Sequence, residues 1–144
     1  MNKNHPLLLV RIIAGIIFLT EGILKFVYPG ELGSGRFAHI GLPMPQILAP
    51  FVAGVEIAAG AALILNAYAG AAAALLLCVI VTALVTTKIP ILLGHGLGPF
   101  SIPKNTAHTG LLGFVHEART DLAMLFSLIA ILIDARGIGT RPKR

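Results

Sequence analysis

Residues 47–93 decide the fold, and they read ILAPFVAGVEIAAGAALILNAYAGAAAALLLCVIVTALVTTKIPILL. The segment contains two long apolar stretches, 47–65 and 67–93, and only Asn66 and its immediate neighbours separate them. Each stretch is long enough for an α-helix to cross the hydrocarbon core of a bilayer, which takes roughly 17–25 residues. Because the connection is so short, the two helices must run antiparallel. The segment therefore predicts a tight hairpin of two membrane-spanning helices.

One further apolar stretch lies on each side of this hairpin, at 7–28 and at 114–134. We expect the first to be a retained helix rather than a signal peptide, because it is long and no small-residue cleavage site follows it. The uninterrupted apolar part of the last stretch covers only 122–133, so its polar beginning must be sheltered by other helices or reach the interface. The sequence predicts an all-α fold, a four-transmembrane-helix bundle that forms a single domain over 1–144.

The composition agrees with a membrane protein. Of the 144 residues, 56% are hydrophobic and 12% are charged, about half of the roughly 25% charged residues in typical soluble domains. A small soluble protein needs more charge to cover its surface, and disordered chains are poor in apolar residues. The expected partner is therefore the lipid bilayer, and the net charge of +5 is not distributed as nucleic-acid binding requires. The one cysteine, Cys78, cannot form an internal disulfide, and we expect it to pack within its helix.

Basic residues predict the orientation in the membrane. Four spans place both ends of the chain on one side and the long connections 29–46 and 94–113 on the other. Lys and Arg are more numerous beside the ends, so both termini are predicted to be cytoplasmic. The first outer connection has room for a short interfacial turn, and the second is either an ordered lid or a disordered loop. The basic residues compared are Lys3, Arg11, Arg136, Arg141, Lys143 and Arg144 near the ends, and Arg36, Lys88 and Lys104 on the outer side.

Small residues predict helix packing in the central hairpin. They recur at helical spacing on both of its arms, and small side chains let helix backbones approach each other in lipid. We therefore expect these residues to take part in helix packing; the alternative is that alanine is merely tolerated in apolar helices. The residues concerned are Gly54, Ala58, Ala61 and Ala62 on the first arm and Gly70, Ala71, Ala73 and Ala74 on the second.

The first predicted helix carries a polar stripe. At 100° per residue, Glu21 and Lys25 lie about 40° apart, and Arg11 lies within about 80° of both. Arg11 is near the cytoplasmic end, where its long side chain reaches water. Glu56 lies near the centre of the second helix, where a charged side chain costs about 2.5–3.5 kcal/mol. Glu56 is therefore either neutral and hydrogen-bonded across the bundle, or it handles protons or binds a ligand.

The last predicted helix opens with HEARTD at 116–121. Glu117 and Asp121 are four residues apart and share one face. The beginning is like the zinc motif H-E-x-x-H, but Thr120 stands where the second histidine is required, so this zinc site is excluded. The other histidines on the outer side lie in loops without a recognisable ligand spacing, and we expect no metal or haem site.

These positions bring ionisable residues together in the outer half of the bundle. They comprise four acids and three bases, and the extra carboxyl can stay protonated and exchange a proton. The alternative is a salt-bridged network that only fixes the register of the helices. The candidate ligand-binding or proton-handling residues are Glu21, Lys25, Glu56, Lys88, His116, Glu117, Arg119 and Asp121.

Six segments of the chain together form a recognisable pattern: RIIAG (11–15), EGILKF (21–26), GLPMP (41–45), APFVAGVEIAAG (49–60), TKIP (87–90) and HEARTDLAM (116–124). With these segments the chain resembles the DoxX family of small four-helix membrane proteins over nearly its whole length. At its C-terminus it departs from the many relatives that end in a glycine-rich turn and a Ser-Leu-Asp segment, since 136–139 is followed by a basic tail.

This resemblance implies a function in membrane redox chemistry. Members of the family are named for a subunit of a thiosulfate:quinone oxidoreductase or are associated with redox stress. The resemblance thus implies a small subunit of a quinone-linked redox system in the plasma membrane of a bacterium or archaeon, with a quinone or similar small molecule in the outer half of the bundle. The chain has no flavin, iron–sulfur or dithiol motif, so no covalent cofactor is expected. The redox centre is then a diffusible quinone or belongs to a membrane or peripheral partner subunit.

Two other functions stay open. The chain is alternatively a non-catalytic assembly or scaffold subunit of a membrane complex, in which the charged residues only fix the helix register. It is alternatively a proton-coupled small-molecule transporter, for which a central Glu56 is suited. Four helices without an inverted repeat argue against a transporter that acts alone, so this function requires a homo-oligomer.

Overall fold

The computed structural model describes residues 5–137, and it confirms the all-α fold. Among the described residues, the only β pairing is an isolated bridge between Leu97 and Phe100. The long helices are α1 (His5–Val27), α3 (Pro45–Leu65), α4 (Ala69–Ala83) and α6 (Gly110–Ala135); the short elements are α2 (Ser34–Ile40), the π-helix η1 (Leu84–Lys88) and α5 (Ile89–Leu93).

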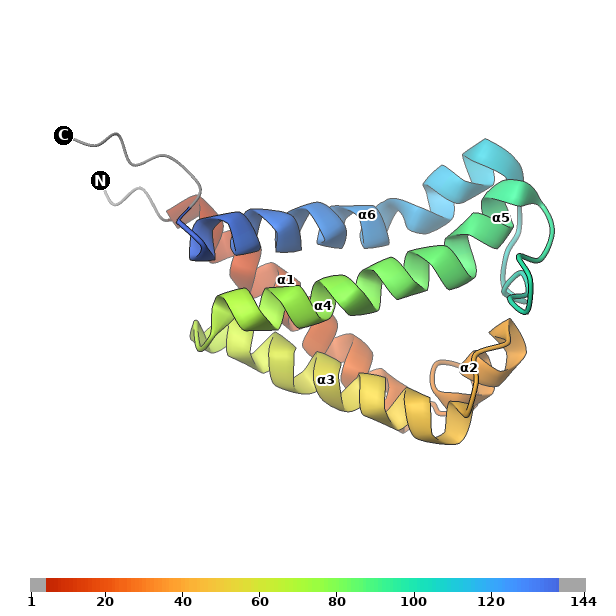
Figure 1. The fold of residues 1–144 in the computed structure, drawn as a ribbon, viewed down its shortest axis with the longest axis horizontal. Helices are drawn as coiled ribbons and strands as arrows, with labels where there is room; N and C mark the ends of the chain where they lie inside the picture. The colour runs from red at the N-terminus through yellow and green to blue at the C-terminus, as the bar shows by residue number, and fades with distance from the viewer. Residues whose placement is uncertain (1–4, 138–144) are drawn as a thin grey trace.

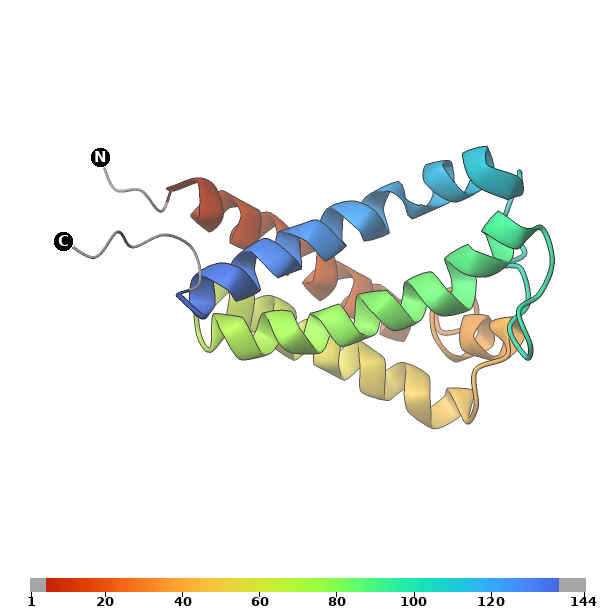
Figure 2. The ribbon, with the colours of Figure 1, turned by 45° about the horizontal axis from the view of Figure 1, so that its top comes forward.

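The long helices form two pairs, α1 with α3 and α4 with α6. Contacts within each pair are more extensive than contacts between the pairs. The pairs lie close together at the end where α3 turns into α4, and they diverge toward α2 and α5 (Figures 1 and 2). We call these the hairpin end and the loop end. The start of α1 and the end of α6 both lie at the hairpin end.

The predicted tight hairpin is confirmed. Helix α3 ends at Leu65, and Asn66 adopts the left-handed conformation with φ 56°, which asparagine tolerates better than most residues. Tyr68 also has a positive φ of 51°, and α4 begins directly after it, at Ala69 rather than at the expected position 67. The chain therefore reverses within three residues, as the short connection requires.

The predicted single helix over 67–93 is not regular. It contains the π-helix η1, which precedes Pro90. Proline has no N–H group, and in a regular α-helix its ring would collide with the carbonyl of the residue four positions earlier, here Thr86. The widened turn avoids this collision. Threonine hydroxyls also donate to carbonyls four residues earlier: Thr86 to Thr82 at 2.8 Å, and Thr87 to Ala83 at 2.6 Å. Such bonds bend helices. The widened turn ends at Lys88, which is buried.

The closest helix contact lies between α1 and α3, outside the hairpin whose small residues were predicted to pack. A Cβ atom placed on Gly22 would lie 2.6 Å from the carbonyl oxygen of Ala53, and one on Gly60 would lie 2.8 Å from that of Gly15. Gly54, which was expected in the hairpin contact, has nothing within 4 Å of such an atom. The small residues of α1 thus determine the tightest packing, because they face α3 directly.

Hydrophobic side chains from all four long helices form a core nearer the hairpin end. Within this core Leu63 from α3, Leu76 from α4 and Leu128 from α6 are fully buried, and Phe18 from α1 is almost so. The core holds the two pairs together at this end, and a space between the pairs remains nearer the loop end.

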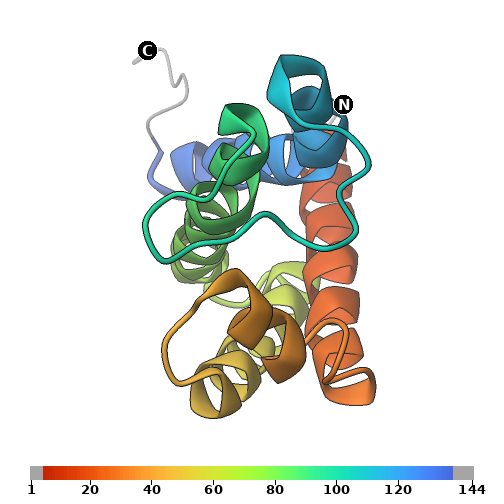
Figure 3. The ribbon, with the colours of Figure 1, turned by 90° about the vertical axis from the view of Figure 1, so that its right-hand side faces the viewer.

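The loop end is closed by α2 and by the segment between α5 and α6. The first long connection, for which a short turn was expected, contains the helix α2, whose Phe37 and Ile40 are buried. The second segment crosses the end of the bundle beside α2 (Figure 3), and the Ser101 amide donates a hydrogen bond to the Ile40 carbonyl oxygen over 3.2 Å. Gly41 has φ +89°, and a side chain there would collide with the Pro99 carbonyl.

Three helical segments of the described chain are long and apolar enough to cross a membrane: Pro6–Val27, Pro45–Leu65 and Ala69–Leu93. Helix α6 is 26 residues long, but its first half carries Glu117, Arg119 and Asp121. It begins at Gly110, earlier than the expected position 114, so the connection before it is shorter than predicted.

Candidate functional site

A cavity of about 540 Å³ lies between the two helix pairs, toward the loop end. Its volume is within the range of about 300–1,000 Å³ that is usual for small-molecule sites. Apolar residues form most of the wall, among them Phe18, Phe37, Val52 and Met124. The charged residues along the cavity are Glu21, Lys25, Arg36, Glu56, Lys88, Glu117 and Asp121.

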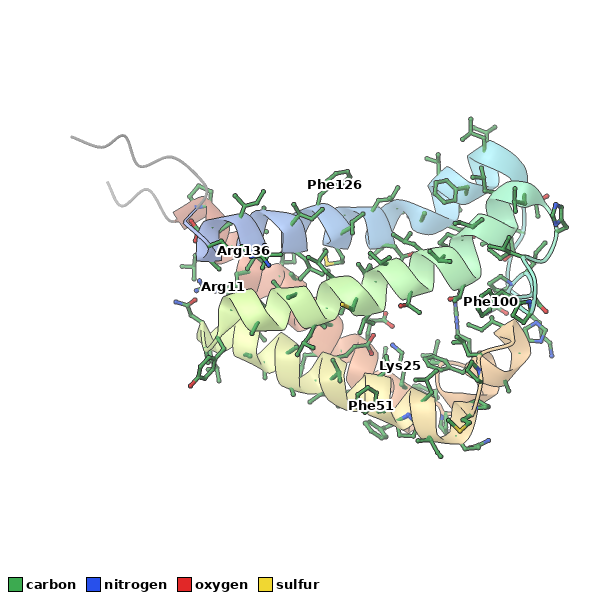
Figure 4. The ribbon with its side chains drawn as sticks, viewed as in Figure 1. Arg11, Lys25, Phe51, Phe100, Phe126 and Arg136 are labelled. Atoms are coloured by element: carbon green, nitrogen blue, oxygen red, sulfur yellow. The ribbon has the colours of Figure 1, made fainter. Side chains whose placement is uncertain are left out.

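One wall of the cavity contains an ion pair between α1 and α3. The Lys25 ammonium donates a hydrogen bond to a Glu56 carboxylate oxygen over 2.7 Å, and a Glu21 oxygen lies 3.7 Å from the same nitrogen. Only 12% of the Lys25 side chain and 5% of the Glu56 side chain are exposed. Glu21 and Lys25 share a face because they are four residues apart, and the close approach of α3 at Gly22 brings Glu56 to them. Figure 4 shows Lys25 in the space between α3 and α4.

The opposite wall contains a second ion pair, between η1 and α6. Lys88 Nζ lies 3.3 Å from an Asp121 carboxylate oxygen, and 11% of the Lys88 side chain is exposed. The π-helix determines where Lys88 points, since a widened turn rotates the residues that follow relative to a regular helix. In residues 5–137, no ion pair joins the two walls across the cavity.

Two further charged residues line the cavity, Arg36 from α2 and Glu117 from α6. Neither makes an ion pair with any other described residue. From the sequence, Arg36 bears only on the orientation, and its position at the cavity was not predicted. A signal was present, because Phe37 and Ile40 are the apolar residues that bury α2 against the bundle and so bring Arg36 to the cavity.

The structure brings six of the eight predicted site residues to one cavity, and leaves His116 and Arg119 outside its lining. Both side chains are exposed, and Arg119 donates a hydrogen bond to the His116 carbonyl oxygen. The reason is helical geometry: Glu117, Asp121 and Met124 follow the i, i+4, i+7 spacing of one face, so 116 and 119 point elsewhere.

The cysteine and threonines of α4 add weakly polar groups to the lining. Cys78 was expected to pack within its helix, but it is exposed and lies at the cavity, with Thr82 one turn further on. Within residues 5–137, no three His, Cys, Asp or Glu side chains group so that they could hold a metal ion. The cavity thus offers cationic donors and carboxylate acceptors beside apolar walls, which suits a small molecule with both polar and apolar parts.

Fold and cavity together define a small helical membrane protein with a charged, ligand-sized cavity inside its bundle. The DoxX family model matches residues 6–89, a range that includes Lys25, Glu56 and Lys88. An uncharacterized membrane protein of Mycobacterium tuberculosis is 38% identical over 135 residues, which cover 94% of this chain and 78% of that relative. The chain therefore belongs to the DoxX family. No solved structure matches it.

Proposed function

We propose that this DoxX protein binds a quinone or a similar small molecule in its cavity, as a small subunit of a quinone-linked redox system. The observation that carries the proposal is the cavity itself, with buried ammonium groups of Lys25 and Lys88 on its two walls. Carbonyl oxygens of a quinone accept hydrogen bonds from such donors, and its ring is suited to the apolar lining. The electrons come from a membrane or peripheral partner subunit, because the chain has no redox cofactor motif.

The same proposal includes four membrane spans with cytoplasmic termini, in the plasma membrane of a bacterium or archaeon. Helix α6 is the fourth span, and its charges support this assignment by their placement. Asp121 is paired with Lys88, and Glu117 lines the cavity, so both carboxylates avoid lipid. Charged residues within membranes face a bundle interior or a wet cavity in this way.

A scaffold function is the second candidate. It is favoured by the fact that each ion pair joins two neighbouring elements, Lys25–Glu56 across α1 and α3, and Lys88–Asp121 across η1 and α6. Pairs of this kind fix the helix register whether or not a ligand is present. The two functions give Arg36 different roles. Arg36 lines the cavity and has no ion-pair partner among the described residues. It therefore does not fix the helix register through an ion pair, but it can contact a ligand.

The test is binding of 2,3-dimethyl-1,4-naphthoquinone, whose substituted ring does not add thiols, to the purified protein in mild detergent, measured by equilibrium dialysis. The Arg36→Gln variant is expected to bind at least about tenfold more weakly, because a hydrogen bond from a charged group contributes about 1.5–3 kcal/mol. Arg119→Gln is the matched control, since Arg119 is exposed and outside the cavity lining, and it is expected to bind as the wild type does. Absence of binding to the wild-type protein would contradict the quinone function and favour the scaffold.

A further inference from the structure

An apolar groove of about 520 Å³ lies along α3 and α4, on the surface of the bundle. Several of its lining residues have little or no side chain, among them Gly54, Ala58 and Ala71, which are exposed. Larger apolar residues, among them Phe51 and Leu75, complete the lining. The residues that line the groove are Pro50, Phe51, Gly54, Val55, Ala58, Ala59, Ala62, Tyr68, Ala71, Ala72 and Leu75.

The groove adjoins the cavity along both helices. On α3, Val52 lines the cavity, while Phe51 and Val55 line the groove. On α4, Leu75 lines the groove, and Cys78, three residues later, lines the cavity. Side chains three residues apart are neighbours on a helix surface. Since Cys78 is exposed, it stands at the rim where the cavity opens into the groove.

The other ways out of the cavity do not suit a hydrocarbon chain. The loop end is closed by α2 and the segment after α5, which the Ser101–Ile40 hydrogen bond joins. The hairpin end is filled by the core around Phe18 and Leu76. The side between α1 and α6 carries Glu21, whose side chain is 53% exposed, and the exposed Thr120. Within residues 5–137, the side between α3 and α4 borders the apolar groove, whose lining contains no charged residue.

We propose that the cavity and the groove form one site for an amphiphile with a long hydrocarbon chain. The polar head lies in the cavity near Lys25, Arg36 and Lys88, and the chain passes over Cys78 into the groove above Gly54 and Ala58. The inference rests on the proposed function for the identity of the head. It adds that the ligand is long-chained, that it enters sideways from the bilayer, and that α3 and α4 hold its chain.

The first experiment compares two probes, 2,3-dimethyl-1,4-naphthoquinone without a tail and a menaquinone with a long isoprenoid tail, on the same detergent-solubilised protein. Both rings are substituted at C2 and C3, so neither adds to the Cys78 thiol. With affinity expressed per concentration of probe in the detergent phase, the tailed probe is expected to bind at least severalfold more tightly. The reason is that its chain gains van der Waals packing in the groove that it lacks among detergent chains. The double variant Gly54→Leu/Ala58→Leu fills the groove and is expected to remove this difference, while the tailless probe binds as before. Ala130→Leu is the control, because Ala130 is exposed on α6 and lines neither the groove nor the cavity.

The second experiment uses the wild-type protein and so does not depend on the folding of a variant. Cys78 is the only cysteine in the chain, and its alkylation by N-ethylmaleimide is followed by mass spectrometry. The tailed probe at saturation is expected to slow the reaction severalfold, and the tailless probe is expected to slow it much less.

The outcomes separate this inference from the proposed function. If both probes bind equally tightly and slow the alkylation of Cys78 to the same extent, the long-chain site is wrong, while quinone binding stands. If neither probe binds, both are wrong. If the groove variant changes cross-linking between copies of the protein and leaves the affinity of the tailed probe unchanged, the groove is a protein contact and the inference is again wrong.

Discussion

Lys25 and Glu56 form the most buried ion pair in the described part of the chain. Removal of one partner from such a pair leaves an uncompensated charge in a low-dielectric surrounding, whereas removal of both leaves none. Lys25 also has Glu21 at 3.7 Å, so the loss of Glu56 still leaves the ammonium a second carboxylate. The two partners are thus coupled in their effect on stability.

This coupling predicts the result of a double-mutant cycle. Lys25→Met and Glu56→Gln are each expected to lower the free energy of unfolding by about 3–5 kcal/mol, with Glu56→Gln at the lower end because of Glu21. The double variant is expected to lose clearly less than the sum of the two. Unfolding is followed by circular dichroism in mild detergent, with the exposed Arg119→Gln as the control. Additive losses would show that the pair contributes nothing as a unit.

At this scale the sequence could predict which charged residues are unfavourable within the membrane, but it could not predict which of them form ion pairs with each other. The Glu21–Lys25 pair follows from spacing within one helix, and the depth of Glu56 follows from the length of its apolar stretch. The contact between Lys25 and Glu56 spans 31 positions and depends on the register of α1 against α3. That register is set by Gly22 against Ala53, a contact that no single helix reveals. Arg36 was missed for a similar reason, since only the packing of α2 brings it to the cavity.

At the scale of the elements, glycines on α1 and α3 have opposite surroundings. Gly22 faces the backbone of α3, and Gly54 faces open space. A methyl group at position 22 must push the two helices apart, and overpacking of this kind costs about 1–3 kcal/mol. A methyl group at position 54 meets nothing and gains helix propensity.

The matched pair Gly22→Ala and Gly54→Ala tests this difference with the same chemical change. Gly22→Ala is expected to lower the free energy of unfolding by about 1–3 kcal/mol, and Gly54→Ala to leave it unchanged or raise it by up to about 1 kcal/mol. Thermal unfolding in detergent measures both. Equal effects of the two substitutions would contradict the packing of α1 against α3.

The elements themselves were largely predictable, because apolar length and turn residues identify membrane helices directly. Asn66 marks the hairpin, and the polar beginning of α6 shows that this helix needs partners. The π-helix was not predicted. Pro90 indicates a break, but whether the helix kinks, ends or widens depends on how the Thr86 carbonyl and the neighbouring hydroxyls are accommodated. The hairpin contact was predicted wrongly at Gly54, because small residues mark close packing without saying which helix approaches.

At the scale of the whole molecule, the proposed orientation is open to a direct test with single cysteines. In a Cys78→Ser background, Thr106→Cys lies in the segment between α5 and α6, and Thr140→Cys lies in the basic tail, outside the described residues. An impermeant thiol reagent added to intact cells is expected to label position 106 and not position 140, because basic flanks stay in the cytoplasm. Lysed cells, in which both positions react, provide the control. Labelling of position 140 from outside would reverse the orientation.

The Lys88–Asp121 pair also bears on how the chain is built into the membrane. On the insertion scale an aspartate or lysine at the centre of a helix costs about 2.5–3.5 kcal/mol, and the ribosome delivers α6 after the other described helices. Insertion of α6 into lipid on its own is therefore unfavourable. Until α6 is made, Lys88 at the end of η1 has no carboxylate partner in α6. Under the proposed four-span arrangement, we expect α6 and the segment α4–α5 to leave the translocon together, after the Lys88 ammonium has paired with the Asp121 carboxylate. In a chain that ends before Asp121, Lys88 would have no ion-pair partner in α6. We expect membrane quality-control proteases to degrade such an incomplete bundle.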